Sequence, residues 1–391
     1  MGWNGVIDQG RAVETLRRAL ASGRVAHAYL FHGPDGVGKR AAALAFAQAL
    51  ECQRRGPGEA DPCGTCPACQ KVAKMLHPDV HLYLPQPNDA GTDDIAVRFQ
   101  RLGQNPYAEV DFRRRPTLDD PTKTSTKQVI YNVDRVREIT RALRYSPAEG
   151  RHKVAILTDA DAMNEASANA FLKGLEEPTD HTVIILTASR PDRLLPTILS
   201  RCQRLRFDTL PAEVIERALV ERASLDPEHA ALLARMADGS YTRALVLSES
   251  EELARQRAHV LAFFRAAFSG SGDAVDDLVA DLAGLGREGL KGVLGLMLGW
   301  VRDLVLARHA GAEAALVNVD QRAAVHRFVQ NLPAARLDAL ADLVEHAHEL
   351  VERNANATLV LTVLADAMRA AMRGQARHRL FAPLAEPAET R

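Results

Sequence analysis

One loop near the start of the chain has the residue types that cradle phosphate. Residues 33–40 read Gly-Pro-Asp-Gly-Val-Gly-Lys-Arg, which matches G-x-x-x-x-G-K as far as Lys39. The next position of that pattern is a Ser or Thr whose hydroxyl binds Mg²⁺, and this chain has Arg40 there. Backbone N–H groups at a helix N-terminus can still hold a phosphate. The sequence therefore predicts a degenerate nucleotide site in which ATP or ADP binding stays open. Its residues are Gly33, Gly36, Gly38, Lys39 and Arg40.

A second candidate is the carboxylate that ends the apolar run at 154–158. An apolar strand followed by an Asp, here Asp159, is typical of the element that holds Mg²⁺ beside a phosphate loop. In ATP-hydrolysing proteins with this element, the next residue is a Glu that positions water, and here it is Ala160. Two interpretations of Asp159 stay open: a part of the nucleotide site, or a solvated residue at the end of a strand.

Four of the five cysteines lie close together, with the spacing of a metal site. They form a C-x10-C-x2-C-x2-C arrangement, and Cys202 is remote from it. Four thiolates in a tetrahedron suit Zn²⁺, and a site closed by four protein ligands is structural rather than catalytic. The alternatives are an iron–sulfur cluster or four unrelated buried cysteines. The predicted ligands are Cys52, Cys63, Cys66 and Cys69.

The last single-residue candidate is Arg201, in the run Leu-Ser-Arg-Cys at 199–202. An Arg in an exposed loop at a subunit boundary can stabilise charge on a phosphate that a neighbouring chain holds. Taken alone, such a side chain is more often simply solvated.

Composition excludes some classes of protein. The 391 residues carry a formal net charge of −1, so the whole chain is not a polyelectrolyte that coats DNA. Basic residues between 127 and 151 leave open a local patch that faces DNA, although a solvated helix face is the commoner outcome. No apolar run approaches ~18–20 residues, so no membrane span is expected. The N-terminus lacks the pattern of a secretory signal, and we expect a cytoplasmic protein.

Strands and helices alternate through residue 208. We expect strands around 27–32, 79–84, 153–158, 182–187 and 203–207, and helices at 12–22, 41–52, 133–144 and 164–176. This alternation predicts a mostly parallel sheet covered on both faces. Residues 85–126 lack a clear period, and we expect a long surface insertion there.

Beyond residue 208 the strand pattern stops. Short helices are expected at 212–222, 226–237 and 241–248, and amphipathic helices alone from about 251. We therefore expect an α/β P-loop domain at 1–208, which contains the cysteine module at about 52–69 and the insertion at about 85–126. A small helical domain at 209–250, an all-α domain at 251–380 and a tail at 381–391 follow.

Several runs together resemble the delta-prime group of bacterial DNA polymerase III clamp-loader subunits. They are residues 26–31 before the phosphate loop, the cysteine module, 77–80, 168–178 and the Ser-Arg-Cys triplet at 200–202. The resemblance implies an AAA+ domain, a helical lid at 209–250 and a collar at 251–380 that joins a ring of subunits. It also implies gamma/tau and delta subunits as partners, and contact with a sliding clamp and primed DNA through the complex, in the replisome.

Three departures separate the chain from ATP-hydrolysing gamma/tau subunits. They are Arg40, Ala160 and Thr242, which stands where gamma/tau-like chains have an Arg that senses the γ-phosphate. The resemblance implies a subunit that does no catalysis alone, within a nucleotidyltransferase holoenzyme. Its Arg201 would act as an arginine finger in the ATP site of a neighbour. Two competing hypotheses are an active gamma/tau-like ATPase and a DNA-binding protein that uses its zinc module.

Overall fold

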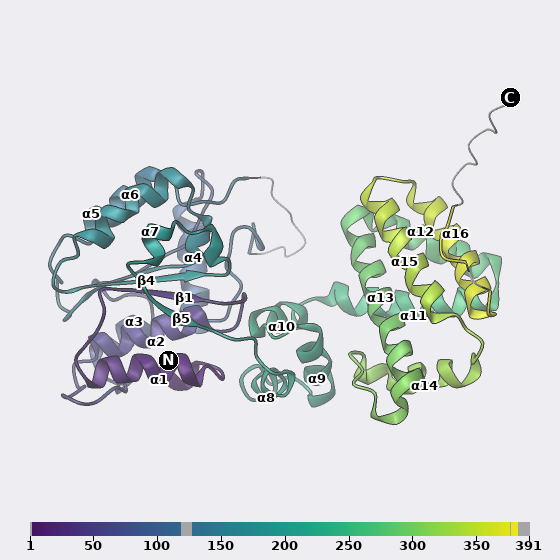
Figure 1. Ribbon diagram of the computed structural model, residues 1–391, viewed down its shortest axis with the longest axis horizontal. Helices are drawn as coiled ribbons and strands as arrows, with labels where there is room; N and C mark the ends of the chain where they lie inside the picture. The colour runs from purple at the N-terminus through teal and green to yellow at the C-terminus, as the bar shows by residue number, and fades with distance from the viewer. Residues whose placement is uncertain (1, 119–126, 376, 382–391) are drawn as a thin grey trace. The chain divides into compact units, whose positions relative to one another are not determined.

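The computed structural model describes residues 2–118, 127–375 and 377–381 (Figure 1). The chain forms two compact units. The α/β unit comprises Met1–Leu225 and Ala237–Val246, and the helical unit comprises Asp226–Met236 and Leu247–Arg391. The end of the expected insertion, 119–126, and the expected tail from residue 382 lie outside the described residues. The division into three domains stays a prediction.

A five-stranded parallel sheet forms the centre of the α/β unit. The strand order is β2-β3-β4-β1-β5, and every neighbouring pair is parallel. The strands are β1 (Ala28–His32), β2 (Val80–Tyr83), β3 (Lys153–Leu157), β4 (Thr182–Ala188) and β5 (Gln203–Arg206). The predicted parallel sheet and each of the five predicted strands are therefore confirmed.

Helices cover both faces of this sheet (Figure 1). Tyr29 and Phe31 of β1 belong to the core under α1 (Gly10–Ala21) and α2 (Lys39–Glu51). Ala28 and Leu30 of the same strand belong to the opposite core. That second core is closed by α5 (Val133–Ala142), α6 (Glu165–Glu176) and the short α7 (Pro196–Leu199). Since side chains alternate along a strand, apolar residues at successive positions fill both faces.

The expected irregular insertion contains a helix, α4 (Thr92–Gln104). Arg98 is fully buried in it and obscures the apolar period that normally reveals a helix. Its guanidinium lies 3.6 Å from the centroid of the Phe112 ring and donates to Val110 O and Pro116 O at 2.7 and 2.9 Å. Helix α4 therefore lies within 85–126, where the sequence shows no clear period, and it anchors the segment that follows it.

The remaining elements are helical. In the α/β unit they are η1 (Trp3–Gly5), α3 (Pro67–Ala73), η2 (Ala160–Ala162), η3 (Pro191–Arg193), α8 (Ala212–Ala223) and most of α10 (Tyr241–Ser248). The helical unit contains α9 (Pro227–Met236), α11 (Glu251–Ser269), α12 (Gly272–Gly284), α13 (Gly286–Ala310), η4 (Gly311–Glu313), η5 (Val319–Gln321), α14 (Arg322–Asn331), α15 (Leu337–Glu352) and α16 (Ala357–Met372).

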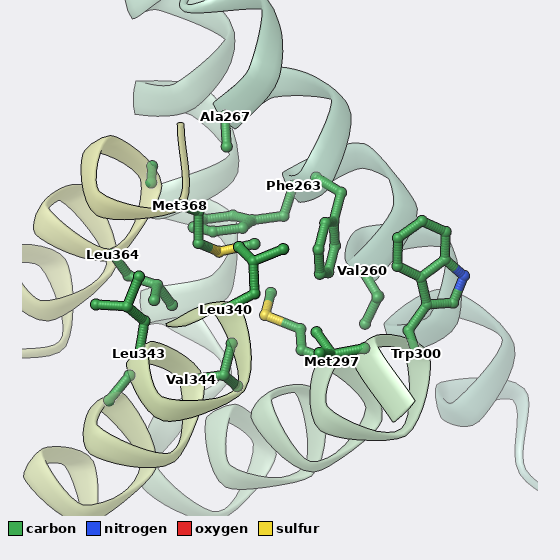
Figure 2. Packing of buried hydrophobic residues seen from close by; sticks show 14 of the residues in the cluster. Val260, Phe263, Ala267, Met297, Trp300, Leu340, Leu343, Val344, Leu364 and Met368 are labelled. Atoms are coloured by element: carbon green, nitrogen blue, oxygen red, sulfur yellow. The ribbon is translucent and has the colours of Figure 1, made fainter. Parts of the chain in front are cut away.

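One apolar core holds the helical unit together. Phe263 of α11, Met297 of α13, Leu340 of α15 and Met368 of α16 meet in its centre, and each is at most 1% exposed (Figure 2). Within the described part of the chain, no helix combines the length and apolar character needed to cross a membrane.

Candidate nucleotide site, metal centre and arginine loop

The phosphate loop has the expected setting between a strand and a helix. It joins the end of β1 to the first residue of α2, Lys39. Gly36 and Gly38 have φ values of +72° and +109°, a region that favours glycine. Gly36, Gly38, Lys39, Arg40 and Asp159 line one cavity. Gly33 does not line it and lies at the start of the loop, against the backbone of residue 207.

Protein atoms pack closely against two glycines of the loop. A Cβ on Gly36 would collide with Ser240 Oγ, and a Cβ on Gly38 would lie 2.8 Å from Tyr107 Oη. Thr242 N donates to Gly36 O at 3.4 Å, and Thr242 Oγ1 donates to Tyr107 O at 2.9 Å. Residues 240–242, at the start of α10, and Tyr107, three residues after the end of α4, therefore pack directly on the loop.

Lys39 is turned toward its own loop. Its Nζ donates to Gly33 O at 2.6 Å, to Pro34 O and, at 3.3 Å, to Ser189 Oγ. The side chain is 6% exposed, and burial lowers the pKa of the ammonium despite the attraction of Asp35. An ammonium has three N–H donors, and here protein oxygens accept all three.

Arg40 stands where the phosphate-loop pattern has a Ser or Thr, and its side chain has a structural role. Its Nε donates to Pro106 O at 3.0 Å, and its Nη2 donates to Ala108 O. Arg40 thus holds the segment after α4 against the first turn of α2. The substitution that removes the Mg²⁺ ligand also supplies the donors that bind this segment.

Four carboxylates and two further arginines complete the site. Arg114 pairs with Asp35 at 3.1 Å, with Glu109 at 3.4 Å and with Asp111 at 3.3 Å. Arg113 pairs with Asp111 at 3.0 Å and lies 4.0 Å from Asp159. When Lys39 and Arg40 are included, this cluster has four positive and four negative groups, so it offers little attraction to the phosphates of a nucleotide.

Asp159 does not have the environment of a free metal ligand. Burial, and then the charge of Asp111, raise the pKa of its carboxyl to about 6, although Arg114 and Arg113 act in the opposite direction. Its backbone N–H donates to Thr187 Oγ1 at 3.0 Å. Ala160 is fully buried, and Asp161 lies 3.9 Å from Arg190.

The cavity that remains beside the loop measures about 50 Å³. Pockets that hold a small ligand usually measure roughly 300–1,000 Å³, so a nucleotide does not fit without displacing protein. We call residues 106–118 the plug, because five residues of this segment line the cavity. Sequence reasoning missed the plug because a segment without a period carries no sign of where it packs. The one available signal is the run Asp-Phe-Arg-Arg-Arg at 111–115, which places like charges where an acidic partner is needed.

The four predicted cysteines come together. Their Sγ atoms all lie within 4.8 Å of one another, and Cys63 Sγ and Cys69 Sγ are 4.0 Å apart. Tetrahedral Zn–S bonds of about 2.3 Å place sulfurs roughly 3.8 Å apart, so the cluster fits a metal ion after a small contraction. Backbone N–H groups of Cys63 and Cys66 point at neighbouring sulfurs at 3.3 Å. This pattern stabilises thiolates, the form in which cysteine binds metal.

Arg201 lies apart from the plugged site and does not line its cavity. It follows α7 and precedes β5, and its side chain is 36% exposed. One Nη atom pairs with Glu176 at 2.8 Å, and the other donates to Thr197 O at 3.0 Å. Burial raises the pKa of the next residue, Cys202, to about 12, so its thiol stays neutral. The guanidinium is therefore held at the surface with donors to spare.

A parallel sheet with a glycine-rich loop between β1 and α2 defines the chain as a P-loop-type α/β protein with a helical C-terminal part. Comparison with protein families narrows this class. The family described as DNA polymerase III, delta subunit, matches residues 8–211, and the family for the C-terminal part of that subunit matches 251–366. The chain therefore belongs to the DNA polymerase III delta subunit family, as the sequence motifs predict.

Individual relatives agree with this assignment. DNA polymerase III subunit delta′ of Bacillus subtilis is 31% identical over 66% of this chain, and that of Pseudomonas aeruginosa is 35% identical over 60%. The matches span 64% and 56% of those two proteins. DNA polymerase III subunit tau of Escherichia coli is 30% identical over 62% of this chain and 32% of its own length. A solved gamma subunit-related protein of Thermotoga maritima covers 94% of this chain and 100% of its own chain at 18% identity, but with a TM-score of 0.36.

Proposed function

We propose that this chain is a clamp-loader subunit of DNA polymerase III that does not hydrolyse ATP and acts on a neighbour's ATP site. In this proposal it joins gamma/tau-type and delta-type subunits in a cytoplasmic complex, which loads a sliding clamp onto primed DNA. The plug is the observation that carries the non-hydrolysing role. Its Arg113 lies beside Asp159 and its Arg114 pairs with Asp35 of the phosphate loop. Lys39 is satisfied by carbonyls of its own loop, and the cavity that remains is too small for a nucleotide.

The active part of the chain is then Arg201. Its guanidinium is fixed by Glu176 and Thr197 but remains accessible. Placed against the γ-phosphate of ATP in an adjacent subunit, it would neutralise charge that develops as the phosphoryl group leaves. Such fingers raise turnover by on the order of 10³–10⁵-fold. Ser200 donates to Thr197 O at 3.1 Å and shapes the loop.

The remaining parts have supporting roles. The segments at 209–250 and 251–380 serve as lid and collar, by analogy with the family. The cysteine cluster holds a structural Zn²⁺, through Cys52, Cys63, Cys66 and Cys69, and the ion would tie the end of α2 to the start of α3. Support for this comes from the arrangement of the four sulfurs. Neither competing hypothesis gains support: the ATPase lacks a free site, and Arg55 of the cysteine module donates to Ala49 O and Glu59 O at 2.8 and 3.0 Å.

The test is ATP turnover, measured first on the isolated chain and then in a complex with gamma/tau, delta, clamp and primed DNA. We expect no turnover by the isolated chain and stimulated turnover by the complex. Arg201→Ala should reduce turnover at the site it serves by roughly 10³–10⁵-fold. Arg204→Ala is the matched control, because Arg204 is an exposed arginine three residues away. Its effect should stay within about two-fold, as for most exposed arginines.

Two outcomes would contradict the proposal in different ways. Turnover by the isolated chain would restore the active ATPase hypothesis, despite the plug. Unchanged turnover in the Arg201→Ala complex, with normal assembly, would leave the chain only a scaffolding role.

A further inference from the structure

A groove in the helical unit lies far along the chain from the residues discussed above. It is within the segment proposed as the collar, and the proposed function assigns it no ligand of its own. It runs between α11 and α14 and has a volume of about 210 Å³. The α11 wall presents Leu261, Phe264 and Phe268, at helical spacing, and the opposite wall presents Ala324, Phe328 and Leu332. Two helix faces with apolar residues one turn apart form the kind of surface that receives the apolar face of another helix.

Aromatic rings make the groove rigid. Trp300 of α13 also lines it, with ring centroids 4.6 Å from Phe264 and 5.5 Å from Phe328. Trp300 is 3% exposed and Phe264 is 2% exposed, whereas Phe268 at the end of the groove is 44% exposed. A large apolar side chain with this exposure is uncommon in the chain, since only six such residues occur among the described ones.

A polar group of the groove wall is also unsatisfied. The indole Nε1 of Trp300 is buried without a hydrogen-bond partner among the described residues. In Figure 2 this nitrogen lies on the side of the ring that faces away from Met297 and Val260. A buried N–H without an acceptor is unfavourable.

The charges at the groove have one sign. Arg265 stands on the α11 wall and Arg327 on the α14 wall, and both are exposed. Neither forms an ion pair or side-chain hydrogen bond within the described residues, in contrast to Arg257 of α11, which pairs with Asp320 at 2.8 Å. No carboxylate lines the groove in the described part of the chain. An occupant should therefore carry acidic groups on both sides of its apolar residues.

We propose that this groove is a docking site for an acid-flanked amphipathic helix of another protein. Leu-sized or Phe-sized side chains of that helix would enter between α11 and α14, and Asp or Glu on its two flanks would pair with Arg265 and Arg327. The volume of about 210 Å³ suits a few side chains rather than a nucleotide or an organic cofactor. Single-stranded nucleic acid fits less well, because bases need exposed ring faces and only Phe268 is exposed.

The experiment uses the full chain and three fluorescein-labelled probes, with binding measured by anisotropy. Two probes are helical peptides with identical Leu and Phe anchors, one flanked by Glu and the other by Lys. The third probe is oligothymidylate. The wild type should bind the Glu-flanked peptide at least about ten-fold more tightly than the Lys-flanked one, because like charges at an interface are unfavourable.

Two charge-reversed variants make the test specific. R265E/R327E should invert the preference and bind the Lys-flanked peptide more tightly. R302E/R353E carries the same change in charge at exposed residues outside the groove, and it should keep the wild-type preference. Phe268→Ala should weaken both peptides by roughly five- to ten-fold, as expected for an anchor contact at an interface. Thermal unfolding checks that each variant folds.

The proposal is overturned if the wild type binds both peptides equally or neither of them, or if R302E/R353E inverts the preference as well. Binding of oligothymidylate that R265E/R327E abolishes, without binding of the Glu-flanked peptide, would assign the groove to nucleic acid instead. None of these outcomes depends on Arg201 or on ATP turnover, so the proposed function stands or falls separately.

Discussion

The phosphate loop and the Arg201 loop belong to the same unit, and both carry side chains suited to phosphate, but they treat those side chains in opposite ways. At the phosphate loop, Lys39 and Arg40 are satisfied by protein oxygens. Arg201 has two protein partners and is 36% exposed. The donors of Lys39 and Arg40 are taken up by protein oxygens, whereas the Arg201 guanidinium keeps unused donors at the surface.

This difference shows that a motif and its function can separate. A phosphate loop can survive as a structural element, because its glycines allow close packing whether the neighbour is a phosphate or a side chain. An arginine loop needs only exposure and a defined direction to act on a partner. Four predictions follow from this comparison. Three concern the stability of the unit around the phosphate loop, and one concerns the anchoring of the Arg201 side chain.

The largest effect should follow from loss of the metal at the cysteine cluster, which lies at the far end of α2 from the phosphate loop. Cys66→Ser should remove bound zinc and destabilise the α/β unit, because the free energy of metal binding contributes to folding. We expect the melting temperature to fall by roughly 10–20 °C, which corresponds to about 5 kcal/mol for a unit of this size. Cys202→Ser, outside the cluster, is the control. Equal zinc content in both variants would contradict the proposal that the four cysteines bind zinc.

A loss of about 3–5 kcal/mol in the free energy of unfolding is expected for Arg98→Ala. The change leaves the buried carbonyls of Val110 and Pro116 without donors and removes the packing against Phe112. Urea unfolding measures it. Arg101→Ala, three residues away on α4, removes only one weak bond at 3.4 Å. If the two variants lost equal stability, the plug would not be anchored by Arg98.

A pH-dependent gain is expected for Asp159→Asn. The folded pKa of about 6 exceeds the ordinary value of 3.8, so the wild type binds a proton more readily when folded. Its stabilising contribution is fully present below about pH 3.8 and is lost as the pH rises through 6. The neutral Asn should therefore raise the free energy of unfolding by about 1–3 kcal/mol at pH 8.

Urea unfolding at pH 8 and pH 4 separates this effect from a general change in packing. Little or no gain should remain at pH 4. A gain of equal size at both pH values, or a loss at pH 8, would mean that Asp159 is not a desolvated carboxyl.

The smallest effect is expected at the Arg201 loop. Glu176→Gln removes one of the two anchors of Arg201 and should lower stimulated turnover in the complex by about two- to five-fold, since ion pairs at the surface contribute up to ~1 kcal/mol. Glu177→Gln, at the adjacent residue, is the control. A rise in turnover would instead mean that Glu176 holds the guanidinium back from its target.

The regular elements and the cysteine cluster could be predicted from the sequence. The helix expected at 164–176 is α6 (Glu165–Glu176), because the alternation of strand and helix patterns is a local property of the chain. The cysteine cluster was predictable for the same reason, since three of its ligands lie within seven residues. Helix α4 was not predicted, because the buried Arg98 interrupts its apolar period. A buried guanidinium is stable only with tertiary hydrogen-bond partners, which the local sequence does not show.

The sequence by itself determined what the nucleotide site lacks: Arg40 and Ala160 remove a metal ligand and the residue that positions water, and no fold restores them. Only the tertiary structure decided what takes the place of the nucleotide. Glu109, Asp111 and Arg114 lie about 70 residues beyond the phosphate loop along the chain, and they reach it because Arg98 and Arg40 hold the plug from two sides. Contacts between distant segments depend on the packing of the whole unit, and no local pattern of residue types records them.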